Sequence, residues 1–332
     1  MHTAPYLSTR HAVHSPHSDS FTVPLVEPFV KHLQLTSWHM STPNSGTTRP
    51  GSPNPAAPHG KLQQQIIEEM QVKPTIDPAA EVRERVQFLV DYARSTDTKG
   101  FTLGISGGQD STLAGRLCQL AVEELQQSGV PAEFWAIRLP YGIQFDEDDA
   151  QMALAFIKPS QSITVNIQDA TLATAEAVSR SLNQGALTDF NKGNVKARQR
   201  MIVQYTVASE TGTLVVGSDH AAESVTGFYT KFGDGAADVM PLTGLNKRQG
   251  AQLLEHFGAP KETWEKIPTA DLEEDRPQLS DEEALGVSYQ HIDDYLEGKQ
   301  VPAAAAERIE HLWQVSKHKR TTPPGPADSW WR

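Results

Sequence analysis

Six consecutive residues, 106–111, combine small, flexible and polar side chains in an order suited to holding a phosphate group. They read Ser-Gly-Gly-Gln-Asp-Ser, they follow an apolar run, and they precede a stretch with helical periodicity. Paired glycines let the backbone turn tightly and bring its N–H groups close to an anion, and the helix N-terminus behind them adds unpaired N–H donors. The loop lacks the Gly-Lys-Ser/Thr ending of a Walker A motif, so it is expected to be a phosphate-binding loop of another kind.

Asp110 adds a carboxylate at the point where a phosphate is expected to bind. Two anions come together there only if a cation lies between them, and Mg²⁺ prefers carboxylate and phosphate oxygens as ligands. We therefore predict Mg²⁺ as the cofactor and Asp110 as one of its ligands. An ordinary glycine turn capped by Asp110 or Ser111 is the simpler alternative.

Alternating strand-like and helix-like segments must position this loop. Strands are expected at 100–105, 133–139, 162–167 and 213–217, and helices at 61–71, 79–94, 111–127, 146–157, 170–182 and 195–209. This alternation indicates βαβ units and an α/β fold, a doubly wound parallel sheet with flanking helices. Ligands of such sheets bind outside the carboxyl ends of the strands, which is where the loop 106–111 lies.

The composition argues against several classes of protein. The chain has 332 residues, of which 41 are acidic and 29 basic, so its formal net charge is −12 and a nucleic-acid partner is not expected. The sequence shows no apolar run near the roughly 20 residues that span a bilayer, so no membrane association is expected. The single cysteine, Cys118, cannot form an intrachain disulfide, which predicts a cytoplasmic location.

Composition also divides the chain into three parts. Residues 1–60 hold 7 of the 12 histidines and 9 of the 22 prolines, and we expect them to be a disordered N-terminal extension. Residues 61–322 carry the regular pattern and are expected to form the one functional domain. Residues 323–332 are expected to be a tail.

The loop and its surroundings resemble a known family. Ser-Gly-Gly-x-Asp-Ser is similar to the PP-loop of the ATP pyrophosphatases, and further strings resemble the ammonia-dependent NAD⁺ synthetases in the same order: 103–115, 138–144, 216–223, 245–250 and 268–272. The likeness runs from about residue 62 to about residue 319. It implies an adenine-nucleotide α-hydrolase-like fold and a homodimer. It also implies a ligase: ATP adenylates the nicotinate carboxylate of deamido-NAD⁺, and ammonia then gives NAD⁺, AMP and pyrophosphate.

The resemblance implies roles for individual residues. The implied catalytic residues are Asp110 and Lys247, and the implied metal ligands are Asp110 and Glu223. The implied ATP contacts are Gly104, Ile105, Ser106, Gly107, Gly108, Gln109, Asp110, Ser111, Arg138, Gln144, Ser218, Lys247 and Thr269. The implied deamido-NAD⁺ contacts are Arg198, Lys231, Asp238, His318, Lys319, Phe190 and Phe228. Ser218 stands where the family usually has Thr, which keeps the hydroxyl.

Several of these residues also have purely structural interpretations. Arg198 shares a helix face with Met201, Ile202, Tyr205 and Ala208 at about 100° per residue, so we expect it on a buried face beside an anion, with Lys196 and Arg200 pointing away. Phe190 and Phe228 fit the core as well as they fit stacking on a nicotinate ring. His220 and Glu223 form one pair without a third ligand nearby, so zinc is not expected. The acidic runs 146–149, 273–275 and 281–283 are expected to be solvated.

Two other functions remain open. One is a different PP-loop ligase, such as the synthetase part of a GMP synthetase or a tRNA-thiolating enzyme; the other is a non-catalytic nucleotide-binding module. The missing reactive cysteine and basic surface weigh against thiolation, and Asp110, Glu223 and Lys247 weigh against the module. Cys118 is expected to be a packed side chain inside a helix, not the nucleophile of a glutaminase domain, so free ammonia is the expected nitrogen source.

Overall fold

The computed structural model describes residues 60–142, 147–265 and 280–331. All of them belong to one compact unit. The predicted extension lies outside the described residues except for Gly60, and so do two predicted ATP contacts, Gln144 and Thr269. The described residues after 322 form no helix or strand.

Four parallel strands form the sheet in the described part of the chain, as predicted. They are β1 (Gly100–Gly104), β2 (Glu133–Arg138), β3 (Gln161–Thr164) and β4 (Leu214–Val215), in the order β3-β2-β1-β4. The chain runs outward from β1 through β2 to β3 and then returns to the other side of β1 to form β4. The crossovers therefore reverse direction between β1 and β4, and ligands of doubly wound sheets bind in the crevice at such a reversal.

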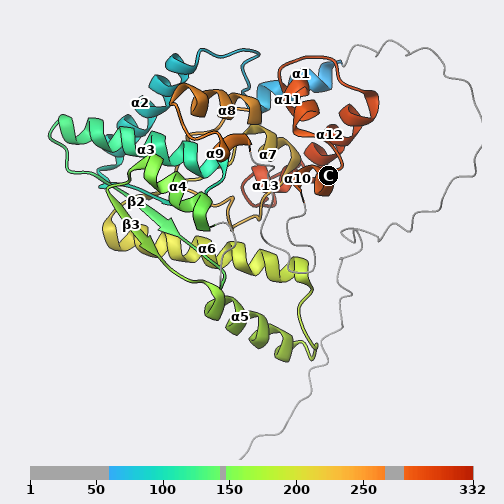
Figure 1. The fold of residues 1–332 in the computed structure, drawn as a ribbon. Helices are drawn as coiled ribbons and strands as arrows, with labels where there is room; N and C mark the ends of the chain where they lie inside the picture. Colours follow the sequence, from blue (N-terminus) through green and yellow to red (C-terminus); the bar gives the residue numbers. More distant parts are fainter. Residues whose placement is uncertain (1–59, 143–146, 266–279, 332) are drawn as a thin grey trace, which may run out of the picture. The chain divides into compact units, whose positions relative to one another are not determined.

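Helices cover both faces of this sheet (Figure 1). On one face, α3 packs against β1 and β2, with α2, α4 and α8 beside it; on the other, α6 packs against β1 and β4, with α5 outside it. Their bounds are α2 (Pro78–Thr96), α3 (Gln109–Gln127), α4 (Glu147–Ile157), α5 (Gln168–Ser181), α6 (Asp189–Thr211) and α8 (Lys247–His256). Because both faces are covered, three consecutive residues of β1, whose side chains alternate between the two faces, are all buried: Phe101, Thr102 and Leu103.

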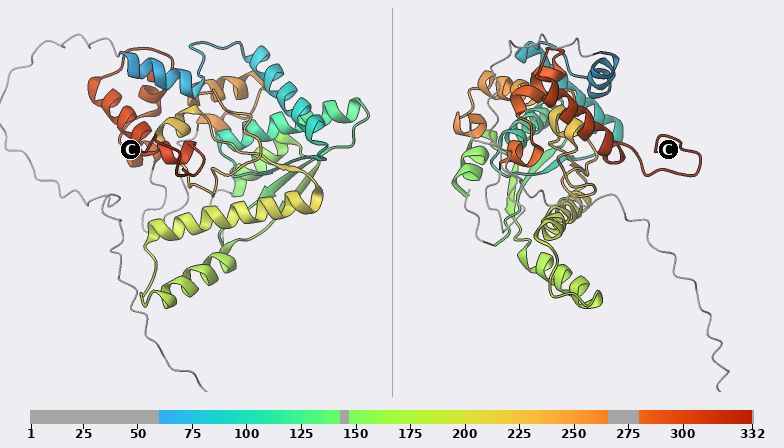
Figure 2. Two further views of the ribbon diagram at one scale, coloured as in Figure 1. Left: turned by 180° about the vertical axis from the view of Figure 1, so that it is seen from behind. Right: turned by 90° about the vertical axis from the view of Figure 1, so that its right-hand side faces the viewer.

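The helix α6 is longer than its apolar pattern predicts. It begins at Asp189, six residues before the expected start at 195, because the Thr188 hydroxyl accepts a hydrogen bond from the backbone N of Asn191 and caps the first turn. Figure 2 shows α5 and α6 side by side along one face of the sheet.

A second group of helices packs the first helix of the described chain, α1, against helices that come after residue 220. Their bounds are α1 (Lys61–Met70), α7 (Ala221–Thr226), α10 (Asp281–Leu285), α11 (Tyr289–Leu296) and α12 (Ala303–Val315), and the short helices α9 (Glu262–Glu265) and α13 (Lys317–Arg320) lie nearby in the chain. Ile66, Val225, Ile292, Tyr295 and Ile309 meet in one apolar cluster. Apart from α1, these helices fall where the sequence analysis assigned no elements. Within this group α11 contacts α7, and α11 also contacts α8 of the first group.

Two features bear on the predicted class of protein. Cys118 is a free thiol buried inside α3, as predicted, and burial raises its pKa. Within the described ranges, no helix combines the length and the apolar character needed to cross a bilayer.

Candidate active site

The loop 106–111 joins the end of β1 to the start of α3, as its sequence predicts. Gly107 has a φ of +92°, and a Cβ at this position would lie 2.6 Å from the backbone N of Ala150 in α4, so the turn requires glycine. The hydroxyls of Ser106 and Ser111 lie 3.0 Å apart across the turn. The backbone N of Ile105 is held by the carbonyl of Ile137, which fixes the loop against the neighbouring strand.

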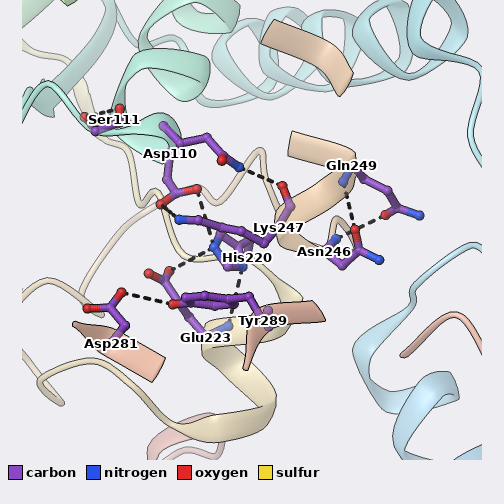
Figure 3. A network of polar contacts seen from close by, with 12 residues as sticks. Asp110, Ser111, His220, Glu223, Asn246, Lys247, Gln249, Asp281 and Tyr289 are labelled. Carbon is purple, nitrogen blue, oxygen red and sulfur yellow. Dashed lines mark hydrogen bonds and ion pairs between the residues drawn. The ribbon is translucent and has the colours of Figure 1, made fainter. Parts of the chain in front are cut away.

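Lys247, the first residue of α8, reaches Asp110, the second residue of α3 (Figure 3). Its Nζ lies 2.8 Å from Oδ2 of Asp110, and the side-chain amide of Gln109 donates to the backbone carbonyl of Lys247 at 2.8 Å. Asn246 and Gln249 cap α8 reciprocally, so the helix begins at a defined residue. The two predicted catalytic residues are therefore brought together by two helix starts.

Asp110 and Lys247 keep each other charged. Burial acts to raise the pKa of Asp110, but the Lys247 ammonium outweighs it, so this pKa lies below its usual range. Burial acts to lower the pKa of Lys247, but the carboxylates of Asp110 and Glu223 outweigh it, so this pKa lies above its usual range. Both groups are ionised at neutral pH.

His220 and Glu223, at the start of α7, complete the cluster. Nε2 of His220 lies 3.4 Å from Oδ1 of Asp110 and 3.8 Å from Oε2 of Glu223, and one potential ligand atom of each residue falls within 4.8 Å of the others. The expectation that His220 and Glu223 have no third ligand nearby is wrong. Asp110 is far away in the sequence, but β1 and β4 are neighbours in the sheet, so their carboxyl ends meet.

The donor set fits a magnesium ion better than zinc. Burial lowers the pKa of His220 to about 4, so the ring is neutral. Its Nδ1 accepts a hydrogen bond from the backbone N of Glu223, which places the ring proton on Nε2, the atom that faces the carboxylates. Nε2 is then a donor, and oxygen atoms remain as ligands. Burial, with the nearby charges of Asp110 and Asp219, raises the pKa of Glu223 well above normal, and a cation between the carboxylates relieves that repulsion.

Tyr289 and Asp281 belong to the same cluster and were missed by the sequence analysis (Figure 3). The Tyr289 ring lies 5.3 Å from Nζ of Lys247 and 6.4 Å, centre to centre, from the His220 ring, and its hydroxyl donates to Asp281 Oδ2 at 3.1 Å. The expectation that the run 281–283 is solvated is wrong for Asp281, which is buried. An aromatic residue in an amphipathic helix gives no sequence signal for a polar site, because it looks like core.

Four predicted deamido-NAD⁺ contacts lie around the loop after α7. Nζ of Lys231 donates to the carbonyl of His318, and Nζ of Lys319 donates to the carbonyls of Gly227 and Tyr229, each at 2.7 Å. The guanidinium of Arg198 donates to the carbonyl of Lys231 at 3.3 Å. Arg198, Lys231, His318 and Lys319 are thereby connected through one loop.

The predicted orientation of Arg198 is wrong, because its side chain is exposed. The buried face of α6 carries Gly193, Lys196, Ala197 and Ala208, and Ile202, on the expected apolar face, is 49% exposed. Lys196, expected to point away, is buried with its Nζ 4.2 Å from the Tyr141 ring. The helix packs through its small residues, and Ala197 lies under the turn at Gly233.

Three other predicted contacts, Asp238, Arg138 and Gly104, form hydrogen bonds to other groups of the protein. Oδ2 of Asp238 accepts from the backbone N of Val215 at 2.8 Å. Arg138 is buried and bonds both carboxylate oxygens of Glu147, at 2.6 and 2.8 Å, so this member of the run 146–149 is an ion-pair partner. Gly104 donates its N–H to Gln204 Oε1 at 2.8 Å, and Ser218 is half-buried after β4.

The two predicted aromatic contacts are not brought together. Phe228 packs against the apolar cluster of α1, α7, α11 and α12, whereas Phe190, in the first turn of α6, is 60% exposed. Among the described residues, no ring contact joins the two side chains.

Comparisons with known proteins agree with this geometry. A family model described as NAD synthase matches residues 81–323. The chain is 62% identical over 271 residues to an NH(3)-dependent NAD(+) synthetase of Rhodococcus erythropolis, which covers 82% of this chain and 99% of that protein.

Two solved structures are also similar. An NAD⁺ synthetase from Burkholderia pseudomallei has a TM-score of 0.68 and 45% identity, over 79% of this chain and 96% of that one. An NMN synthetase from Francisella tularensis has a TM-score of 0.67 and 35% identity, over 76% of this chain and 100% of that one. Because the family model matches most of the sequence and the bacterial relative is matched almost end to end, the chain belongs to the NAD synthase family.

Proposed function

We propose that this protein is an ammonia-dependent NAD⁺ synthetase. In the proposed reaction, the nicotinate carboxylate of deamido-NAD⁺ attacks the α-phosphorus of ATP, which releases pyrophosphate and leaves an acyl-adenylate. Ammonia then attacks the acyl carbon, the bond to AMP breaks, and NAD⁺ is formed. The family membership and the similarity to an NH(3)-dependent NAD(+) synthetase support this substrate set.

One observation carries the proposal: the loop 106–111, the Lys247 ammonium and two carboxylates, Asp110 and Glu223, meet at the carboxyl ends of β1 and β4. A carboxylate substrate must approach a polyanionic triphosphate, so the site has to neutralise charge. The N-terminus of α3 and the Lys247 ammonium supply positive electrostatic potential for the phosphates. This arrangement fits cleavage of ATP better than binding alone.

Asp110 and Glu223 are the residues that would hold Mg²⁺. When bound, Mg²⁺ neutralises phosphate charge and stabilises the leaving pyrophosphate. His220 lies beside this pair: its Nε2 is buried without a hydrogen-bond partner among the described residues, 3.4 Å from Oδ1 of Asp110 and 3.8 Å from Oε2 of Glu223. Gly104, Ile105, Arg138, Ser218 and the loop residues border the ATP site in this proposal, and Gln144 and Thr269 stay predictions.

We assign the nicotinate dinucleotide to the loop around Lys231. Three cationic side chains gather there, Arg198, Lys231 and Lys319, with His318 beside them, and they suit the phosphates and carboxylate of deamido-NAD⁺. Asp238, Phe190 and Phe228 remain candidate contacts.

A homodimer is part of the proposal. The helices α5 and α6, with the residue that follows α5, expose five large apolar side chains, a pattern typical of an interaction face: Leu172, Val178, Leu182, Phe190 and Ile202. We place the enzyme in the cytoplasm, since its one cysteine is a free thiol.

Turnover tests the proposal. The purified full-length protein is incubated with ATP, Mg²⁺, ammonium and deamido-NAD⁺, and NAD⁺, AMP and pyrophosphate are measured. Equal amounts of the three products support the proposal. Products formed only from nicotinate mononucleotide would indicate an NMN synthetase, products only from xanthylate a GMP synthetase, and nucleotide binding without pyrophosphate release a non-catalytic module.

A further inference from the structure

One face of α11 is directed at the start of α8. Tyr289, Asp293 and Glu297 are four residues apart, so their side chains line one side of α11 and the residue that ends it. Each of the three contacts the first turn of α8 or the residue before it. Two of these contacts end on Lys247: that of Asp293 at its backbone N–H and that of Tyr289 at its ammonium.

Asp293 fixes the backbone of Lys247. Its Oδ1 accepts from the backbone N of Lys247 at 3.1 Å, and its Oδ2 accepts from the backbone N of Arg248 at 2.8 Å. The first N–H groups of a helix have no partner within the helix, so a carboxylate from another helix holds them firmly. Glu297 adds bonds to the side chains of Asn246 and Arg248, both at 2.8 Å.

Tyr289 contacts the other end of the same lysine. A lysine side chain has four rotatable bonds, so a fixed backbone alone does not place its ammonium. The ring of Tyr289 lies 5.3 Å from Nζ, within the range of a cation–π interaction, on a side chain buried at 6% exposure. The hydrogen bond from its hydroxyl to Asp281 fixes the plane of the ring.

We propose that Tyr289 and Asp293 are positioning residues that hold Lys247 in place for the ATP phosphates, Tyr289 through the ammonium and Asp293 through the backbone. This inference rests on the proposed function, because it takes the ligand of Lys247 to be ATP. It gives α11 a role in the nucleotide site in addition to its packing in the apolar cluster.

The competing explanation is that Tyr289 only fills space beside His220. The two explanations differ in their prediction for a double-mutant cycle. If Tyr289 acts through the ammonium, its replacement matters only while Lys247 is present. If it only packs, its replacement has the same effect with or without Lys247.

The cycle uses Tyr289→Leu, Lys247→Met and the double variant of the full chain. The dissociation constant of MgATP is measured by calorimetry without deamido-NAD⁺, and folding is checked by circular dichroism. We expect Tyr289→Leu to weaken MgATP binding roughly 3- to 30-fold when Lys247 is present and less than about twofold when it is Met. Tyr289→Phe keeps the ring and is expected to restore most of the affinity.

A second pair of variants covers the case in which Tyr289→Leu does not fold. Asp293→Asn leaves one acceptor oxygen in place of two, so the backbone N–H of either Lys247 or Arg248 loses its partner. We expect this variant to bind MgATP more weakly than the wild type, and we expect no such difference in the Lys247→Met background. Asp294→Asn is the matched control, because the Asp294 carboxylate pairs with the side chains of Arg248 and Lys299 and not with the backbone N–H groups that Asp293 holds. Its MgATP affinity is expected to equal that of the wild type.

The outcomes separate the two proposals. Equal losses in both lysine backgrounds, or a Tyr289→Phe variant as weak as Tyr289→Leu, would overturn the positioning role even if NAD⁺ is formed. Coupled losses in MgATP binding would support it even if the protein makes no NAD⁺, and the proposed function would then fail alone.

Discussion

The Nζ of Lys247 and Oδ2 of Asp110 lie 2.8 Å apart, although 137 positions separate the two residues in the chain. The cation proposed to face the phosphates is thus held by the carboxylate proposed to bind Mg²⁺. In the absence of substrate the two charges neutralise each other, so neither group is left without a partner of opposite charge. A magnesium–nucleotide complex can replace this pair without leaving a charge unmatched, because it offers a cation to Asp110 and an anion to Lys247.

Replacing Asp110 by Asn tests the role of this carboxylate. The amide keeps the shape of the side chain but removes the charge, so we expect pyrophosphate release to fall at least about 100-fold. Thermal unfolding should still be cooperative. Asp148→Asn, at an exposed position in the first turn of α4, is the control and should retain wild-type turnover. Normal turnover in Asp110→Asn would refute the metal role.

Replacing Glu223 by Gln tests the second carboxylate. The Mg²⁺ concentration that gives half-maximal turnover is expected to rise by more than about tenfold, since loss of a metal ligand costs at least as much as loss of its outer-shell partner. Glu255→Gln, on the exposed face of α8, should keep the wild-type requirement. A magnesium titration of the three proteins decides the matter, and coincident curves would argue against Glu223 as a ligand.

The buried carboxylate of Asp293 predicts a pH-dependent stability. Burial raises its pKa to about 6, above the ordinary value of 3.8, so the folded chain binds this proton more tightly than the unfolded chain does. The energetic cost of the charged form is therefore fully present above pH 6 and is relieved as the pH falls through 6 toward 4.

The measurement compares wild type with Asp293→Asn in urea unfolding at pH 7.5 and pH 5.0. Stability of the wild type relative to the variant is expected to rise by about 1.4 kcal/mol at the lower pH, because the wild type alone takes up the proton. A difference that stays constant, or that moves in favour of the variant, would contradict the assignment.

The apolar face of α5 and α6 predicts a dimer that one charge can break. Ile202→Asp places a carboxylate in the proposed interface, where it is desolvated without a partner. We expect sedimentation to show a dimer for the wild type and monomer for this variant at micromolar concentration. Val315→Asp, at a comparably exposed position on α12, should leave the dimer intact. Identical sedimentation of all three proteins would place the interface elsewhere or exclude it.

The parts of the site that depend on local geometry were predictable from the sequence. The loop 106–111 needs glycine at a positive φ and a helix that starts directly after it, and consecutive residues of the sequence indicate both features. The order of strands and helices was likewise predictable, because apolar period and turn residues are local signals. Helix starts were less certain: α6 begins six residues early because of a single cap, Thr188.

The parts that depend on contacts between distant segments were not predictable. The face of α6 that carries Arg198 looked buried because it is apolar, but the helix packs through small residues instead and leaves that face exposed. Asp110 joins His220 and Glu223 only because β4 returns to the side of β1. Tyr289 reaches the site because α11 lies against α8, a tertiary contact with no local signature, and Asp281 of α10 joins it by accepting a hydrogen bond from the Tyr289 hydroxyl.

In the proposed reaction, ATP activates the nicotinate carboxylate by adenylation. This step is tested most directly with deamido-NAD⁺ carrying ¹⁸O in both carboxylate oxygens, incubated with the protein, MgATP and ammonium. Adenylation of the carboxylate predicts one labelled oxygen in AMP and the other in the carboxamide of NAD⁺, since the acyl carbon–oxygen bond breaks when ammonia attacks. Label in pyrophosphate or orthophosphate, or unlabelled AMP beside labelled NAD⁺, would contradict it.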